Sequence, residues 1–401
     1  MKQVVWILLL SMASAPSWAA NKKITAQELK EMLTEMQQQK KSDDAVATAL
    51  KQVDVSEQLT AEMLNSLGPL VSGQQSLAQV YILEARTAML LPPAADVPTD
   101  PAPDAATQKA LLDKAADYIS KTYTQLPDVT ATKETLRFQD SMDTVASSSG
   151  VKGSASEVDT SFGLTNSPQY FRFINTAEVA IEDHNGAEKM PSAKDNTPWG
   201  RNGYIALQEQ GPVLTTAFAE AQAAGKITFL RWELVNGKET AVFSFAVEKK
   251  KSHYAVNFCC FPDTDQTGDA RFSGQNGAGQ PGGKAGSGGG VKGNFQTNTN
   301  WKPFKTNTGY HGEIFINAET GIVVRLINQA EFKSSEVIHQ EDTRIDYGPV
   351  TVGDKALVVP VKEFVNTEVV PAGEDSAGKY SVRHTLFYTE FKNYQLASAA
   401  H

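Results

Sequence analysis

The chain has 401 residues, 41% of them hydrophobic, and carries 37 basic and 46 acidic side chains for a formal net charge of −9. This acidic balance gives no electrostatic footprint for nucleic acid and no polybasic patch for an anionic membrane surface. The length is sufficient for two or three domains with their own hydrophobic cores.

The first 19 residues have the pattern of a secretory signal peptide. Lys2 precedes the apolar run of residues 4–10, and small residues stand at Ser17 and Ala19, before a cleavage expected after Ala19 or nearby. The run is shorter than the roughly 20 apolar residues that cross a bilayer, so no transmembrane anchor is expected after cleavage. We therefore expect a periplasmic or secreted protein, with an uncleaved N-terminal anchor as the alternative.

Residues 20–91 are predicted to form a helical region. Thr25 and Glu28 match a capping box, in which each side chain bonds the backbone N–H of the other residue. Apolar residues then recur at helical spacing, in segments separated by polar or Gly-Pro breaks. These patterns predict several short helices packed on one another.

A Pro-rich linker is predicted over residues 92–106, because residues 92–103 contain five prolines. Residues 107–127 return to helical spacing and are predicted to form one further helix. Pro127 ends this helix, since proline disfavours the helical conformation of the residue before it.

From residue 128 to residue 396 the hydrophobic period changes from helical to alternating, as in residues 135–140 (TLRFQD). Alternation of this kind is typical of strands with one buried face. The pairs Asn185-Gly186 and Asn236-Gly237 each join two such runs and are strong hairpin signals. We expect one mostly antiparallel sheet domain over residues 128–396.

One helix interrupts the sheet domain at residues 211–224, with Pro212 in its first turn. The predicted fold class is therefore α+β. An N-terminal helical region precedes a mostly antiparallel curved sheet, an open or half barrel, that carries at least one packed helix.

Residues 274–293 contain ten glycines and are predicted to form a mobile loop, because this composition buries too little apolar surface to order itself. Residues 277–282 and 288–293 match the Gly-x-Gly-x-x-Gly spacing. Neither match has the preceding strand and following helix that a dinucleotide site needs. No cofactor is therefore expected.

The two cysteines, Cys259 and Cys260, are adjacent. Their Cα atoms would lie about 3.8 Å apart, below the usual disulfide range of about 4.4 to 6.8 Å, so a strained vicinal disulfide is only an alternative. In a strand, Cys260 would share the core face with Tyr254 and Val256, while Cys259 and His253 would share the other face. His253 and Cys259 would then lie roughly 20 Å apart, too far to share a metal ion. No metal ligand is expected, and a zinc site on these residues is the alternative.

The stretch from residue 309 to residue 326 contains four side chains of the kind used in catalysis within nine positions: His311, Glu313, Asn317 and Glu319. It admits an acid–base pair of His311 and Glu313 or a plain hairpin. Asn317 can accept backbone hydrogen bonds in a turn, and Gly321 suits a left-handed conformation. We therefore predict a hairpin and assign no catalytic residue.

The segments HGEIFINAETGIVVRL, RIDYGPVTVGDKALVVPVKEF and RHTLFYTEFKNYQL resemble uncharacterised secreted proteins of the acidobacterial type, and the resemblance spans about residues 127–396. The same rhythm is similar to that of periplasmic lipoprotein carriers, although Asn317-Ala318 replaces their Asp-Pro and Val359-Pro360-Val361 replaces their Leu-Pro-Val. This second resemblance implies a curved antiparallel sheet wrapped around helices, with an apolar cavity for acyl chains. It implies no catalytic residues.

These observations favour an exported cell-envelope protein that binds or carries an apolar or lipid-like ligand in a curved-sheet cavity. The first alternative is a non-catalytic interaction or structural protein that docks an envelope partner through its helices and an edge strand at residues 387–394. The second is a hydrolase without a recognisable motif. An apolar cavity of roughly several hundred Å³ between the sheet and the helix at residues 211–224 would favour ligand binding, and a filled core would favour an interaction protein.

Overall fold

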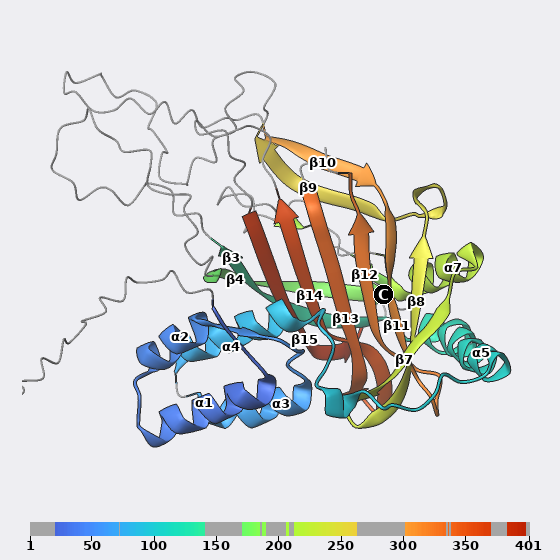
Figure 1. Ribbon diagram of the computed structural model, residues 1–401. Coiled ribbons are helices and arrows are strands. Elements are labelled where there is room, and N and C mark those ends of the chain that lie inside the picture. The colour runs from blue at the N-terminus through green and yellow to red at the C-terminus, as the bar shows by residue number, and fades with distance from the viewer. Residues whose placement is uncertain are drawn as a thin grey trace, which may run out of the picture.

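The computed structural model describes residues 21–71, 73–140, 171–184, 187–189, 206–207, 212–262, 301–333, 336, 338–369 and 383–397 (Figure 1). The expected signal peptide, the Asn185-Gly186 turn and the Gly-rich loop of residues 274–293 lie outside these residues. Within the described ranges, none of the helices combines the length and the apolar character that crossing a membrane requires.

The N-terminal region is helical, as predicted, and its described helices are α1 (Ala26–Gln38), α2 (Asp43–Lys51), α3 (Ala61–Leu67), η1 (Gly68–Leu70) and α4 (Gln74–Thr87). The capping box is confirmed, because Thr25 Oγ1 accepts from the Glu28 N–H at 3.1 Å and Glu28 Oε2 accepts from the Thr25 N–H at 2.7 Å. Leu29, Leu50 and Leu83, from three different helices, meet in one buried core. This region therefore folds around its own hydrophobic centre.

The helical region also contains a short parallel ladder, which the sequence did not predict. Strand β1 (Lys22–Ile24) pairs with β2 (Val53–Val55), and both lie in the region of residues 20–91 that was predicted to be helical. Val53 and Val55 are both buried, and β-branched residues that alternate in this way favour a strand over a helix.

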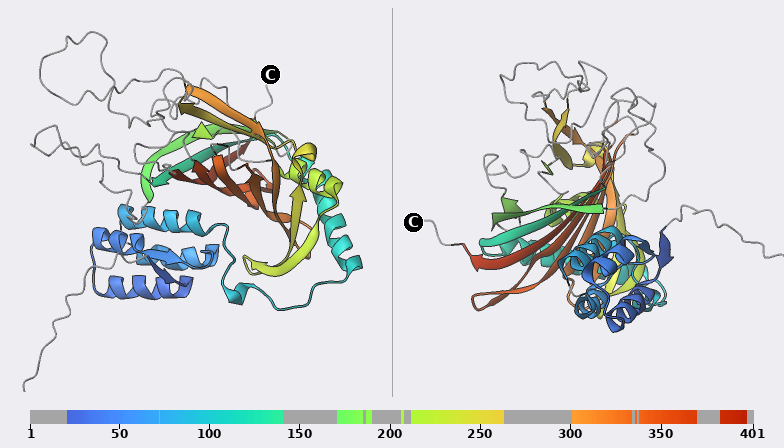
Figure 2. Two further views of the ribbon diagram at one scale, coloured as in Figure 1. Left: turned by 45° about the horizontal axis from the view of Figure 1, so that its top comes forward. Right: turned by 90° about the vertical axis from the view of Figure 1, so that its left-hand side faces the viewer.

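Most of the remaining chain forms one ten-stranded antiparallel sheet in the order β5-β4-β3-β15-β14-β13-β12-β11-β8-β7. Its strands are β3 (Val129–Asp140), β4 (Phe171–His184), β5 (Ala187–Lys189), β7 (Thr228–Val235), β8 (Lys238–Val247), β11 (Gly309–Asn317), β12 (Val323–Glu331), β13 (Ile338–Val352), β14 (Lys355–Val369) and β15 (Arg383–Leu396). The sheet is curved and open, with β5 and β7 at its edges (Figure 2). The predicted α+β class is confirmed.

The proposed edge at residues 387–394 is wrong, because β15 lies between β14 and β3. The β3–β4 hairpin pairs with the last strand of the chain and so buries that edge. A second, three-stranded sheet has the order β10-β9-β6, formed by β10 (Trp301–Asn307), β9 (Ala255–Pro262) and β6 (Ala206–Leu207). In the left view of Figure 2, β9 and β10 lie on one side of the curved sheet and the helical region lies on the other.

The Pro-rich segment contains one turn, η2 (Ala94–Asp96), and passes beside the edge strand β7, where Trp232 Nε1 donates to the Pro101 carbonyl at 3.2 Å. Covering an edge strand with a Pro-rich segment protects it from pairing with other chains. Helix α5 (Ala105–Lys121) begins inside the predicted linker, because Asp104 caps it by accepting from the Thr107 N–H at 2.7 Å. The helix ends at Lys121 and not at Pro127 as predicted, and the turn η3 (Tyr123–Gln125) then leads into β3.

We call the face of the large sheet that packs against α5 and α7 (Leu214–Ala224) the inner face. Leu111 of α5 and Phe218 of α7 pack there in one core with Phe243, Ile314 and Leu326 of the sheet. The expected helix is present, but it begins at Leu214 with Val213 as its N-cap, so Pro212 lies before the helix and not in its first turn. Gly225 ends it in the left-handed conformation (φ 67°). Leu214, Ala217, Phe218 and Ala221 of this helix pack into the space between it and the sheet.

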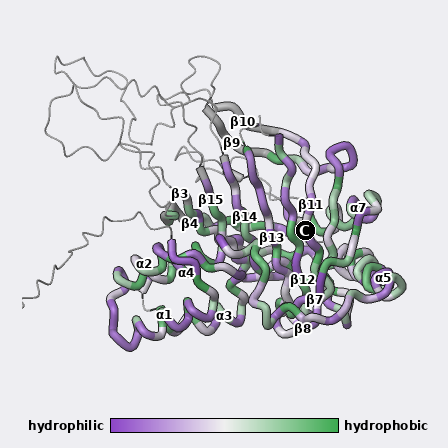
Figure 3. The backbone as a smooth tube through the Cα atoms, viewed as in Figure 1, coloured by the Kyte–Doolittle hydropathy of each residue, from purple (hydrophilic) through white to green (hydrophobic). Residues whose placement is uncertain are grey.

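We call the opposite face of the sheet, which packs against α4, the outer face. Ile82 and Ala85 of α4 lie against Phe138, Phe364 and Tyr388 of the sheet. Hydrophilic and hydrophobic residues are interspersed along the strands (Figure 3). This is expected because successive side chains of a strand point to opposite faces of the sheet. Asn236 (φ 51°) and Gly237 (φ 70°) join β7 to β8, which confirms the second predicted hairpin turn.

Candidate ligand-binding site on the inner face

Residues 309–326 form β11 and the beginning of β12, joined by a tight turn. Asn317 Oδ1 accepts from the N–H groups of Glu319 at 3.2 Å and Thr320 at 2.9 Å, and Gly321 has φ 76°. The predicted hairpin is confirmed, and the polar residues at its tip form the turn.

His311 and Glu313 have different partners on the outer face. His311 Nδ1 lies 3.4 Å from Glu331 Oε1, and both side chains are half exposed. Glu313 instead accepts two hydrogen bonds from Arg231, at 2.8 and 3.1 Å. The structure therefore does not bring His311 and Glu313 together as an acid–base pair.

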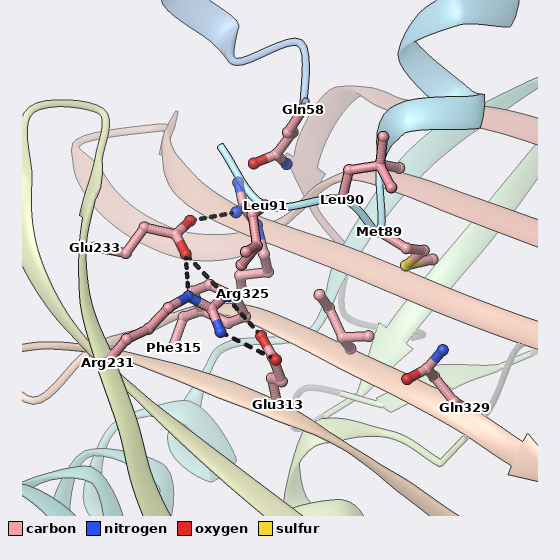
Figure 4. Close-up of a pocket in the computed structure, with 12 residues that line it drawn as sticks. Gln58, Met89, Leu90, Leu91, Arg231, Glu233, Glu313, Phe315, Arg325 and Gln329 are labelled. Carbon is pink, nitrogen blue, oxygen red and sulfur yellow. Dashed lines mark hydrogen bonds and ion pairs between the residues drawn. The ribbon is translucent and has the colours of Figure 1, made fainter. Parts of the chain in front are cut away.

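Glu313 belongs to a group of charged side chains that we call the outer ion-pair network, shown in part in Figure 4. Its four cationic and four anionic members are Arg231, Arg325, Arg344, Lys362, Glu84, Glu233, Glu313 and Asp346. The charges balance. Apart from the sequence spacing of Glu313, the patterns considered in the sequence pointed to none of them.

Asp346 is the centre of this network. Arg325 Nε donates to Asp346 Oδ1 at 2.6 Å, and Arg344 donates to both oxygens at 2.7 and 3.0 Å. Burial disfavours the ionised carboxylate, but these two guanidinium groups hold the pKa of Asp346 well below its usual value. Asp346 is therefore an anion that both arginines require.

The same network holds the helical region on the sheet. Arg344 Nη1 donates to the Ala88 carbonyl at 2.8 Å, and Lys362 Nζ donates to Glu84 Oε1 at 2.6 Å. A cavity of about 60 Å³ remains at this interface, between the segment after α4 and the network residues (Figure 4). A cavity of this size holds only a few waters. The outer network thus has the properties of a structural joint.

The strand that contains the cysteines is β9, where Cys259 lies opposite Ala206 of β6. The side chains of Cys259 and Cys260 are outside the described part of the chain, so their state and the core position of Cys260 stay predictions. Tyr254 and Val256 are buried in the main core, as the alternation predicts. Across the described residues, no three His, Cys, Asp or Glu side chains gather closely enough to hold a metal ion.

His253 lies at the surface just before β9 and binds a buried carboxylate. Glu220 of α7 accepts from the His253 N–H at 2.9 Å, lies 2.5 Å from His253 Nδ1, and accepts from the Tyr310 hydroxyl at 2.7 Å. All of these contacts converge on one carboxylate that fixes α7 to the strands beside it. The signal for Glu220 in the sequence is a lone acid within the apolar helix.

Beside this carboxylate lies a second set of buried polar groups, which we call the inner polar cluster: Tyr254, Asn328, Glu341 and Thr343. Asn328 of β12 lies opposite Thr343 of β13, so their side chains are neighbours on the inner face. Glu341 is two residues from Thr343 and shares that face. None of the four side chains is more than 2% exposed.

Only part of the hydrogen-bonding capacity of this cluster is used. Tyr254 Oη donates to Glu341 Oε1 at 2.8 Å, and Asn328 Nδ2 donates to the Pro212 carbonyl at 3.4 Å. Among the described residues, no hydrogen-bond partner is found for Glu341 Oε2, Asn328 Oδ1 or Thr343 Oγ1. Burial raises the pKa of the Tyr254 phenol well above its usual value, and the nearby Thr343 hydroxyl opposes this shift, although no hydrogen bond within 3.5 Å joins the two groups.

The electrostatic environment keeps Glu341 neutral. Burial raises its pKa to about 8, although the hydrogen bond from Tyr254 favours the ionised form. Asp342 next to it in the chain adds a further unfavourable negative charge. At neutral pH the buried Glu341 side chain is therefore a carboxylic acid that can donate as well as accept a hydrogen bond.

Apolar side chains continue the row that begins at Thr343. Thr343 lies opposite Val365 of β14, and Val365 lies opposite Phe387 of β15. Both apolar residues are buried, at 1% and 3% exposure. The inner face thus presents open hydrogen-bonding atoms beside apolar surface, which suits a molecule with one polar group and an apolar body.

No family model, no curated protein and no solved structure matches this chain. The resemblances to secreted proteins and to lipoprotein carriers are therefore expectations that these comparisons leave untested.

Proposed function

We propose that this chain is an exported cell-envelope protein that binds an amphiphilic, lipid-like ligand on the inner face of its curved sheet. The observation that carries the proposal is the inner polar cluster on the adjacent strands β12 and β13, where three buried oxygen atoms have no hydrogen-bond partner among the described residues. Val365 and Phe387, which are buried in the same row as Thr343, are the apolar side chains that the rest of the ligand would contact.

Buried oxygen atoms of this kind are rare in native proteins, because each unsatisfied polar group costs about 1 to 3 kcal/mol. Three of them grouped together form an arrangement that destabilises the ligand-free fold. Such sites are typical of functional positions, where a bound molecule completes the hydrogen bonds.

A non-catalytic interaction protein is the second candidate. It is favoured by the filled core between α7 and the sheet, where Leu214 and Phe218 occupy the space in which an apolar cavity was expected. In that case the open polar atoms of the inner cluster would bind buried water and no ligand would be found.

Native mass spectrometry of the exported protein, purified without detergent, tests the proposal. We expect a non-covalent adduct on the wild-type chain that disappears on denaturation, and a lower adduct occupancy in Thr343→Val. The matched control is Thr351→Val, an exposed position on the same strand, which should keep the adduct. A bare wild-type chain, with no thermal stabilisation by a lipid extract of the producing cells, would favour the interaction protein.

The same sample tests the export of the protein. We expect its N-terminus near Ala20, after removal of residues 1–19. Exported material that still contains these residues would contradict the expected cleavage.

A further inference from the structure

We propose that the group bound by the inner polar cluster is uncharged and both donates and accepts a hydrogen bond, as a hydroxyl or an amide does. This inference rests on the proposed function and specifies the polar end of its ligand. It follows from which hydrogen-bonding atoms of Glu341, Asn328 and Thr343 already have a partner.

Glu341 supplies the donor. Its Oε1 already accepts from Tyr254 Oη at 2.8 Å, so the acidic hydrogen of the neutral side chain is available on Oε2. Oε2 is buried, and no described residue bonds it. The ligand must therefore present an acceptor at this point, such as a carbonyl or hydroxyl oxygen.

Asn328 supplies the acceptor. Its Nδ2 donates to the Pro212 carbonyl, and its buried Oδ1 has no partner among the described residues. An amide oxygen only accepts, so the ligand must also present an N–H or O–H. Thr343 lies opposite Asn328 in the register and can take either role.

Charged groups fit this cluster poorly. A carboxylate brings no donor for Asn328 Oδ1, and it would add a second acidic group beside Glu341 in a site shielded from water. An ammonium group brings no acceptor for the Glu341 hydrogen, and it would require Glu341 to ionise in a setting that raises its pKa to about 8.

A series of octyl compounds with one tail and different polar ends tests the inference on the full mature chain. The five probes are 1-octanol, octanamide, methyl octanoate, octanoate and octylammonium, and their affinities are compared by calorimetry at pH 7. We expect octanol and octanamide to bind at least about tenfold more tightly than the other three. Methyl octanoate is the informative control, because it accepts but does not donate.

Two variants at one position assign the donor. Glu341→Gln retains a neutral donor and acceptor and should bind octanol within about threefold of the wild type. Glu341→Met removes both and should lose at least about tenfold. Circular dichroism shows whether Glu341→Met folds. If it does not fold, the octanol affinity of Thr343→Val tests the same cluster.

The outcomes separate this inference from the proposed function. Equal or tighter binding of octanoate or octylammonium overturns the inference but leaves ligand binding intact. The third case is that none of the probes binds but native mass spectrometry shows an adduct. A charged polar end on that adduct then overturns the inference. An uncharged polar end that both donates and accepts a hydrogen bond supports it. If none binds and the chain is bare, the proposed function fails as well.

Discussion

The two faces of the large sheet bury polar groups in opposite ways. On the outer face, Arg231, Arg325 and Arg344 share carboxylates at distances of 2.6 to 3.3 Å, and no buried polar side-chain atom described there lacks a hydrogen bond. On the inner face, Glu341, Asn328 and Thr343 each retain a buried oxygen with no described partner. One sheet therefore combines a satisfied polar network with an unsatisfied one.

We interpret this difference as a contrast between the structural polarity of the outer network and the polarity of the proposed ligand site. A buried network in which every charge is balanced fixes one arrangement of the elements it joins, and here it joins α4 to the sheet. A cluster with open hydrogen-bonding atoms destabilises the ligand-free fold and is retained where a ligand completes it. The comparison predicts that substitutions on the two faces change stability in opposite directions.

The largest effect is expected at the centre of the outer network. Asp346→Ala leaves the guanidinium groups of Arg325 and Arg344 buried without their shared anion. Breaking a buried pair in this way costs about 3 to 5 kcal/mol, which urea unfolding at pH 7 measures.

The matched control for this loss is an exposed ion pair on α5. Asp113 and Lys109 lie 2.6 Å apart with side chains 63% and 74% exposed. Asp113→Ala should therefore change the free energy of unfolding by less than about 0.5 kcal/mol. Equal losses in the two variants would show that the outer network contributes no more than a surface pair.

An effect of opposite sign is expected at Glu341. Its folded pKa of about 8 lies above the ordinary value of 4.5, so between these pH values the folded chain keeps a proton that the unfolded chain has released. Its contribution to stability is full below pH 4.5 and is lost as the pH rises through about 8.

Glu341→Gln removes this titration. At pH 8 the variant should be more stable than the wild type by on the order of 4 kcal/mol, and the advantage should shrink toward pH 4.5. Glu363, whose pKa burial raises to about 7 against the opposing charge of Lys133, titrates in the same range in both proteins and cancels in the comparison. A difference in stability that does not depend on pH would contradict the raised pKa.

Local signals in the sequence predicted much of the fold. Thr25 and Glu28 marked a helix start, Asn236-Gly237 and Asn317 marked hairpin turns, and Gly225 ended α7 where helical spacing ends. Each of these signals lies within a few residues of the structure that it specifies. The short β1–β2 ladder was missed because its two strands are far apart in the sequence and only three residues long.

The polar clusters could not be predicted in this way. Asn328 and Thr343 become neighbours through the β12–β13 register, and Tyr254 reaches Glu341, which is 87 positions further along the chain. The alternation of polar and apolar residues predicted on which face of the sheet a residue lies, but not which strand lies beside it. For that reason Glu313 was considered with His311, its neighbour in sequence, while its partner is Arg231 on another strand.

The most direct test of the central claim is the thermal stability of Thr343→Val in the ligand-free protein, compared with Thr351→Val. If Thr343 Oγ1 is an open ligand-binding atom, replacing the hydroxyl by a methyl group of the same shape removes an unsatisfied buried polar group. The account then predicts a gain of about 1 kcal/mol for Thr343→Val, no change beyond about 0.5 kcal/mol for Thr351→Val, and weaker octanol binding in Thr343→Val alone. A loss of stability in Thr343→Val would show that the hydroxyl is already satisfied in the folded chain and would contradict the ligand site.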